Sequence, residues 1–145
     1  MIRFILPLLV LFVAGCAKEP AAYHIAGSEI AITVERIKPY VWSSGWELDL
    51  IVRQHPNCQR RHHMKPTKSD KLKVEVYSPQ RGVFILRQAK RWYVTDLRTC
   101  EMQTFPDPPP EPGELMGAFT VKDGEFKFVE NKDRAAGDNG GAEAE

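Results

Sequence analysis

Apolar and polar residues alternate at a period of two along the middle of the chain, and this pattern predicts half-buried β-strands. In the clearest run, 46–53, Trp46 and three aliphatic residues occupy every second position and most residues between them are polar. Alternation, or a short run of mainly apolar residues, predicts further strands at 30–35, 71–76, 83–87 and 92–97.

Turn-forming residues separate these strands. The sequence Ser-Ser-Gly at 43–45 follows a short strand predicted at 40–42, and a second turn is predicted at 78–82, which contains proline and glycine. The tryptophans are expected in the hydrophobic core rather than on a sugar-stacking surface, and these are Trp42, Trp46 and Trp92.

The segment 119–128 predicts a β-hairpin with a defined register. Asp123-Gly124 suits a two-residue turn with positive φ angles, which places Lys122 opposite Glu125 and Phe119 opposite Phe128. The whole pattern predicts an all-β fold, either an antiparallel β-sandwich or a small barrel of about seven short strands. An α+β fold with one unrecognised helix is the alternative.

The length and composition allow one globular domain, which we place at 29–130. Five prolines within 105–113 exclude a helix or a central strand and favour polyproline II, either as a stiff connection or as a recognition segment. Residues 131–145 contain little to bury and predict a disordered acidic tail.

The first sixteen residues predict an export signal. Arg3 precedes an unbroken apolar run at 4–13, which is too short to span a bilayer. The run ends in Val13-Ala14-Gly15-Cys16, which resembles the lipobox of bacterial lipoproteins. An ordinary signal peptide ending in Gly-Cys is the alternative interpretation.

The lipoprotein resemblance implies a covalent anchor. It implies that 1–15 is a signal peptide, that Cys16 carries a diacylglyceryl group on its sulfur and an acyl group on its nitrogen, and that 16–28 is a lipidated N-terminus and flexible tether. Ala17, in a position where lipoproteins of the inner membrane commonly have Asp, implies the outer membrane of a Gram-negative cell, with the domain facing the periplasm. The inner membrane and the cell surface are the alternative locations.

Charge is divided between a basic middle and an acidic end. Removal of Arg3 leaves 20 − 1 = 19 basic residues against 19 acidic ones, but 53–73 holds seven Lys or Arg and one Asp. Such a cluster attracts an envelope protein or an anionic lipid or glycan, although simple solvation explains it as well. Nucleic acid is excluded by the expected location. The expected patch comprises Arg60, Arg61, Lys65, Lys68, Lys71 and Lys73.

The segment HPNCQRRHHMK, 55–65, contains one of the two cysteines that remain after Cys16. Because an exported domain enters an oxidising compartment, we expect Cys58 and Cys100 to form a disulfide. The alternative is a periplasmic copper or zinc site in 55–64. Adjacent histidines of an extended segment point to opposite faces, which weakens that alternative. Its candidate ligands are His55, His62 and His63.

No catalytic or cofactor motif stands out. The sequence lacks a Gly-x-Ser-x-Gly elbow, a His-Glu-x-x-His motif, a phosphate-binding glycine loop and a dinucleotide fingerprint. Glu47 and Asp49 share a strand face, but they do so with Ile51 and Arg53, as on an ordinary polar sheet surface. We therefore expect a non-catalytic binding, assembly or accessory factor of the bacterial cell envelope, without a cofactor.

Overall fold

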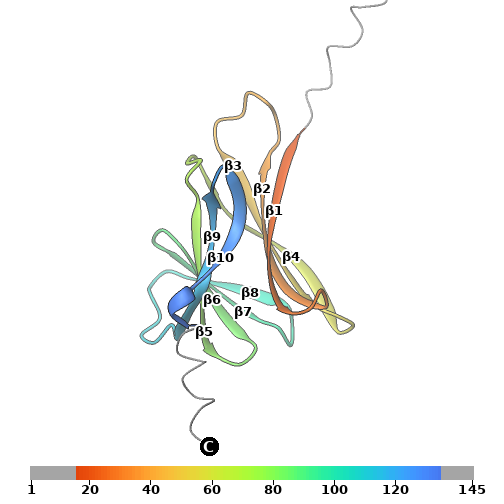
Figure 1. Cartoon of the computed structure of the whole chain (residues 1–145), viewed down its shortest axis with the longest axis vertical. Helices are drawn as coiled ribbons and strands as arrows, with labels where there is room; N and C mark the ends of the chain where they lie inside the picture. Colours follow the sequence, from red (N-terminus) through yellow and green to blue (C-terminus); the bar gives the residue numbers. More distant parts are fainter. Residues whose placement is uncertain (1–15, 135–145) are drawn as a thin grey trace, which may run out of the picture.

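A computed structural model describes residues 16–134, which form ten β-strands in two antiparallel sheets (Figure 1). The first sheet has the strand order β1-β2-β3-β4. Each strand pairs with its neighbour in sequence, because short turns connect antiparallel strands. The sheet contains β1 (Ala17–Ala26), β2 (Ile30–Lys38), β3 (Trp46–Gln54) and β4 (Cys58–Thr67).

The second sheet has the order β10-β9-β5-β6-β7-β8. The chain passes from β8 through the proline-rich connection to β9, which pairs with β5. The C-terminal hairpin therefore extends the β5 side of this sheet. Its strands are β5 (Lys73–Gln80), β6 (Val83–Gln88), β7 (Arg91–Asp96), β8 (Glu101–Phe105), β9 (Glu114–Lys122) and β10 (Glu125–Glu130).

The fold is an all-β sandwich, as the alternation predicts, with two separate sheets rather than a small barrel. Residues 16–134 form ten strands instead of about seven. Helix in the described part of the chain is limited to residues 132–134. No helix within 16–134 has the length and apolarity required to cross a lipid bilayer.

The core lies between the inner faces of the two sheets. Alternate residues of the central strands are fully buried, as period-two alternation requires, among them Ile32 and Leu50 in the first sheet and Val76 and Leu86 in the second. At the edge where β1 packs on β10, the Tyr23 ring stacks on Phe128 with centroids 4.3 Å apart. Burial of these apolar faces supplies the main driving force for joining the sheets.

The C-terminal hairpin has the register that the sequence predicts. Lys122 pairs with Glu125 and Phe119 with Phe128. Asp123 and Gly124 both have positive φ, 55° and 77°, as a two-residue hairpin turn of this type requires. The local sequence is sufficient to define this element.

Three strands depart from the sequence prediction. The expected flexible tether at 16–28 is wrong, because 17–26 forms β1, an edge strand in which Ala21 and Tyr23 face the core. Pro20 is tolerated because an edge strand has one side without ladder bonds. The basic segment between the strands predicted at 46–53 and 71–76 was not predicted as a strand, but its residues 58–67 form β4. Strand β8 was not predicted either.

The prediction for 40–42 is also wrong. These residues lie in the turn region between β2 and β3 rather than in a strand. Trp42 is 76% exposed, whereas Trp46 and Trp92 are buried as expected. Trp42 lies outside the core because strand β2 ends at Lys38, before alternation could direct its side chain inward.

The disulfide between Cys58 and Cys100 is confirmed, and it joins the two sheets at the edge opposite β1 and β10. Cys58 begins β4, and Cys100 precedes β8 with its Cα 6.0 Å away. The His62 Nε2–H donates a hydrogen bond of 2.6 Å to the Cys100 carbonyl oxygen beside it. The polar strand β4 is therefore fastened to the second sheet by covalent and hydrogen bonds.

A buried polar network extends this link. The Tyr93 hydroxyl donates to Gln88 Oε1 at 3.1 Å and accepts from the Lys65 backbone N–H at 3.1 Å. The Gln88 Nε2–H donates to the Lys65 carbonyl oxygen at 2.8 Å. All the polar atoms of this network are paired, as buried groups must be to avoid a desolvation cost.

Candidate anion-binding site

The six residues of the predicted basic patch do not form one surface. Arg60 and Arg61 are neighbours in β4, so their side chains leave opposite faces of the sheet. Arg60 reaches Glu101 at 3.5 Å in an exposed ion pair. Arg61 contacts Asp49 at 2.8 Å and Glu35 at 3.2 Å on the outer face of the first sheet. The structure therefore removes both arginines from the patch.

Asp49 is the centre of that outer-face cluster. Its carboxylate is almost buried and accepts hydrogen bonds from Arg61 at 2.8 Å and from His63 Nδ1 at 2.7 Å. Burial acts to raise the pKa of the Asp49 carboxyl, but these hydrogen bonds and the positive charge of Arg61 outweigh it and hold the pKa below its ordinary value. Arg61 is thus a structural counter-charge.

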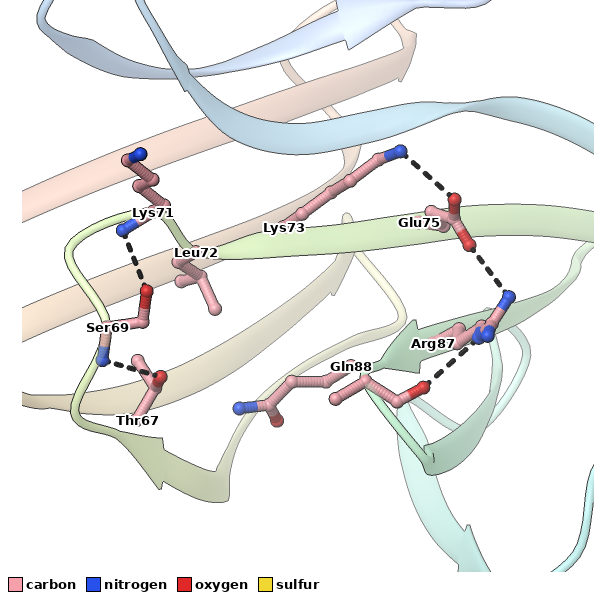
Figure 2. A pocket seen from close by; sticks show the side chains of 9 residues that line it. Thr67, Ser69, Lys71, Leu72, Lys73, Glu75, Arg87 and Gln88 are labelled. Carbon is pink, nitrogen blue, oxygen red and sulfur yellow. Dashed lines mark hydrogen bonds and ion pairs between the residues drawn. The ribbon is translucent and has the colours of Figure 1, made fainter.

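Lys71 and Lys73 instead reach a pocket of about 380 Å³ between the β4–β5 connection and strand β6 (Figure 2). Figure 2 shows the two lysines on one side of it and Arg87 with Gln88 on the other. Three cationic side chains and one carboxylate line this basic pocket, which gives it a charge of +3 − 1 = +2. The lining residues are Thr67, Ser69, Lys71, Leu72, Lys73, Glu75, Arg87, Gln88 and Ala89.

Glu75 holds two of the cations in place. Lys73 Nζ lies 3.2 Å from Glu75 Oε1, and Arg87 lies 3.5 Å from Oε2. Burial acts to raise the pKa of the Glu75 carboxyl, but hydrogen bonds from Tyr77 and Lys73 and the nearby positive charges outweigh it, so its pKa lies below the ordinary value. Glu75 therefore stays ionised at neutral pH and fixes the positions of Lys73 and Arg87.

The hydroxyl groups of the β4–β5 connection add neutral donors to the basic pocket. Thr67 Oγ1 accepts a hydrogen bond from the Ser69 backbone N–H, and Ser69 Oγ accepts one from the Lys71 backbone N–H, both at 3.1 Å. Each hydroxyl proton is then available for donation to a ligand. Gln88 also lines the basic pocket, but its side chain is already bonded to Lys65 and Tyr93 in the inter-sheet network.

Further basic residues continue beyond this pocket. A second pocket is lined by Lys65, Lys90 and Arg91 among others. It lies beside the first, because Lys90 lines the second pocket and the preceding residue of the β6–β7 turn, Ala89, lines the first. Within residues 16–134, Lys65, Lys68 and Lys71 take part in no ion pair. The positive field of this region is therefore only partly neutralised.

The histidines of the alternative metal site are separated. His62 bonds to the Cys100 carbonyl oxygen on the inner side of β4, His63 bonds to Asp49 on the outer side, and His55 lies in the turn before β4. Among residues 16–134, no group of three or more His, Cys, Asp or Glu side chains is arranged to bind one metal ion. Disulfide formation also removes the Cys58 thiolate that such a site would use.

Sequence reasoning missed Arg87 as a principal pocket residue. Arg87 lies 14 positions beyond Lys73 in a different strand, and the two meet because β5 and β6 pair with Glu75 opposite Arg87. The only available signal is the alternation that directs Lys73, Glu75 and Arg87 to the outer face of the second sheet. Cys16 lies exposed at the first position described, directly before β1, with a free thiol.

No protein-family model, no curated protein and no solved structure matches the chain. The chemistry of the basic pocket is that of an anion-binding site, because ammonium, guanidinium and hydroxyl groups all donate hydrogen bonds to phosphate or carboxylate oxygens. The one acidic group in the lining, Glu75, is already paired with two of the cations.

Proposed function

We propose that the chain is a lipid-anchored, non-catalytic binding factor of the bacterial cell envelope that holds an anionic partner at the basic pocket. Cys16 carries the lipid, the sandwich faces the periplasm from the outer membrane, and the partner is an envelope protein or glycan that bears phosphate or carboxylate groups. The observation that carries this proposal is that Lys71, Lys73 and Arg87 all line one pocket, in which Glu75 is the one acidic residue.

Two features support the expected location. Cys58 and Cys100 are joined, and such disulfides persist in oxidising compartments such as the periplasm. Cys16 is exposed at the start of the first strand, where a lipid can be attached without disturbing the core. An anchored domain also meets its partner at a higher local concentration than a free one, so moderate electrostatic attraction is sufficient.

Charge reversal of the pocket tests the proposal. Full-length protein is expressed with Lys71→Glu and Arg87→Glu, captured from native envelopes after mild cross-linking, and its co-purified partner is quantified. We expect the double variant to lose most of the partner, because four units of charge change at the contact.

The matched control carries Arg81→Glu and Lys132→Glu, which change the same charge at exposed positions outside the pocket. This control should recover the partner as the unchanged protein does. Partner recovery should also fall as the salt concentration during capture rises, because salt weakens attraction between exposed charges and largely screens it beyond about 10 Å at about 0.1 M ionic strength. Equal recovery by the pocket variant and the control, or recovery insensitive to salt, would contradict the anion-binding assignment.

A further inference from the structure

The connection between β2 and β3 carries an exposed apolar cluster that the basic pocket does not use. Tyr40, Val41 and Trp42 are 57%, 64% and 76% exposed, and in residues 16–134 Phe105, at 40%, is the only other large apolar side chain in this class. We call residues 39–45 the aromatic loop. Three adjacent exposed apolar side chains indicate a surface that another phase or molecule covers.

The aromatic loop has a defined conformation. The rings of Tyr40 and Trp42 stack with centroids 5.2 Å apart and an angle of 9° between their planes. The Ser43 backbone N–H donates to the Tyr40 carbonyl oxygen at 3.0 Å, and the Tyr40 N–H donates to Ser43 Oγ at 3.1 Å. The rings are therefore presented together at the tip of a closed turn.

The aromatic loop begins beside the residue that is expected to carry the lipid. Ala17 and Lys38 form the terminal pair of the β1–β2 ladder, and Cys16 and Pro39, the first residue of the loop, are the residues directly beyond that pair. Paired residues of neighbouring strands are only about 5 Å apart. Figure 1 shows the start of β1 and the β2–β3 connection at the same end of the sandwich.

Positive charge flanks the aromatic loop. Lys38 precedes it, with its Nζ 4.9 Å from the centre of the Trp46 ring. A side-chain carbon added to Gly45 would lie 3.2 Å from the Lys68 Cα, so Lys68 adjoins the end of the loop. Of the nearby acids, Glu19 is paired with Arg36, and Asp70 accepts a hydrogen bond from Trp46 Nε1 at 2.8 Å, while Glu47 is exposed.

We infer that the aromatic loop inserts into the bilayer that holds the Cys16 lipid, as far as the boundary between the headgroups and the acyl chains; this inference rests on the proposed lipid anchor. Tryptophan and tyrosine prefer the membrane–water interface, where the ring is buried and the polar N–H or O–H stays hydrated. Lys38 and Lys68 lie where anionic headgroups would attract them. A second contact beside the anchor limits how the domain can turn on the membrane.

Quenching of tryptophan fluorescence tests this inference. The full-length lipidated protein is reconstituted in vesicles of phosphatidylethanolamine and phosphatidylglycerol whose acyl chains carry bromine, a contact quencher. We expect loss of emission from Trp42 together with a blue shift, whereas Trp46 and Trp92, which are buried in the sandwich, keep theirs. Trp42→Ser should abolish the quenchable component and leave the rest.

A matched control moves the exposed tryptophan. Arg81→Trp in the Trp42→Ser protein places a ring at the β5–β6 turn, and its emission should not be quenched. Protein that does not float with vesicles would refute the anchor and this inference together. Protein that floats while Trp42 stays unquenched would leave the anchor intact and refute the inserted loop alone. Trp42 emission that instead depends on protein concentration would assign the loop to a second copy of the chain, which also refutes insertion.

Discussion

At the scale of single residues, most buried charge is neutralised within the sandwich. Arg36 is almost buried, with its guanidinium 4.3 Å from the centre of the Trp46 ring and 5.0 Å from that of Phe126, and its ion-pair partner is Glu19. A buried cation requires such partners because desolvation would otherwise destabilise the fold. The pocket lysines differ from Arg36 in being exposed, so their charge remains available to a ligand.

The Asp49 carboxyl should make the fold sensitive to acid. The pKa of this carboxyl is lower in the folded chain than in the unfolded chain. Its contribution to the free energy of unfolding is therefore complete above about pH 4, and it is lost as the pH falls through the pKa of the folded state. Asp49→Asn should lower the free energy of unfolding at pH 7 by roughly 1–3 kcal/mol, since it weakens hydrogen bonds to a charged group. Urea unfolding at a series of pH values from about 2 to about 7 measures both the loss of stability in acid and the effect of the substitution.

The exposed carboxyl of Asp107, in the proline-rich connection, provides the control. Asp107→Asn should leave both the stability and its pH dependence unchanged, because surface charges contribute about 0–1 kcal/mol. If the Asp49→Asn protein loses stability in acid to the same extent as the unchanged chain, Asp49 is not the source of the effect.

At the scale of elements, β4 is the strand whose sequence least favours its structure. Among its ten residues, Met64 is the only buried one. The strand is nevertheless formed, because β3 supplies its ladder bonds and the disulfide, His62 and Lys65 fasten it to the second sheet. Tertiary contacts therefore override a weak local preference.

Loss of the disulfide should loosen β4 before the rest of its sheet. For a sequence separation of 42 residues, the chain-entropy model gives a stabilisation of about 4 kcal/mol, and measured values are commonly about 2–4 kcal/mol. We expect the double variant Cys58→Ala and Cys100→Ala to lose stability in this range. Hydrogen exchange followed by mass spectrometry should show faster exchange at 58–67, with β2 and β3 still protected.

A uniform loss of protection across the first sheet would contradict this local role of the disulfide. Gln88→Ala provides an independent variant, because it removes the hydrogen bonds to Lys65 and Tyr93 without affecting the cysteines. It too should increase exchange in β4 first.

The elements that the sequence predicts well are those with local determinants. Strict alternation locates β3, and Asp123-Gly124 defines the register of β9 and β10. The prediction fails for β1, where Pro20 and the small residues obscure the buried Ala21 and Tyr23, and for β4, which long-range contacts hold. The basic pocket was likewise beyond prediction, since it depends on which strands pair.

At the scale of the whole molecule, Cys16, the aromatic loop and the basic pocket lie toward one end. Thr67 connects the last two, because its carbonyl oxygen adjoins Gly45 at the base of the aromatic loop while the residue also lines the basic pocket. A partner held in the pocket would therefore stay close to the membrane surface. Membrane attachment and partner binding would then act at one end of a rigid sandwich.

The attachment of lipid to Cys16 is the claim on which this arrangement depends, and mass spectrometry of the protein from native envelopes tests it most directly. The account predicts an N-terminal peptide that begins at Cys16 and carries a thioether-linked diacylglycerol and an amide-linked acyl chain. Cys16→Ser should abolish both modifications. A protein recovered with an unmodified Cys16 thiol, or with an N-terminus at another residue, would contradict the account.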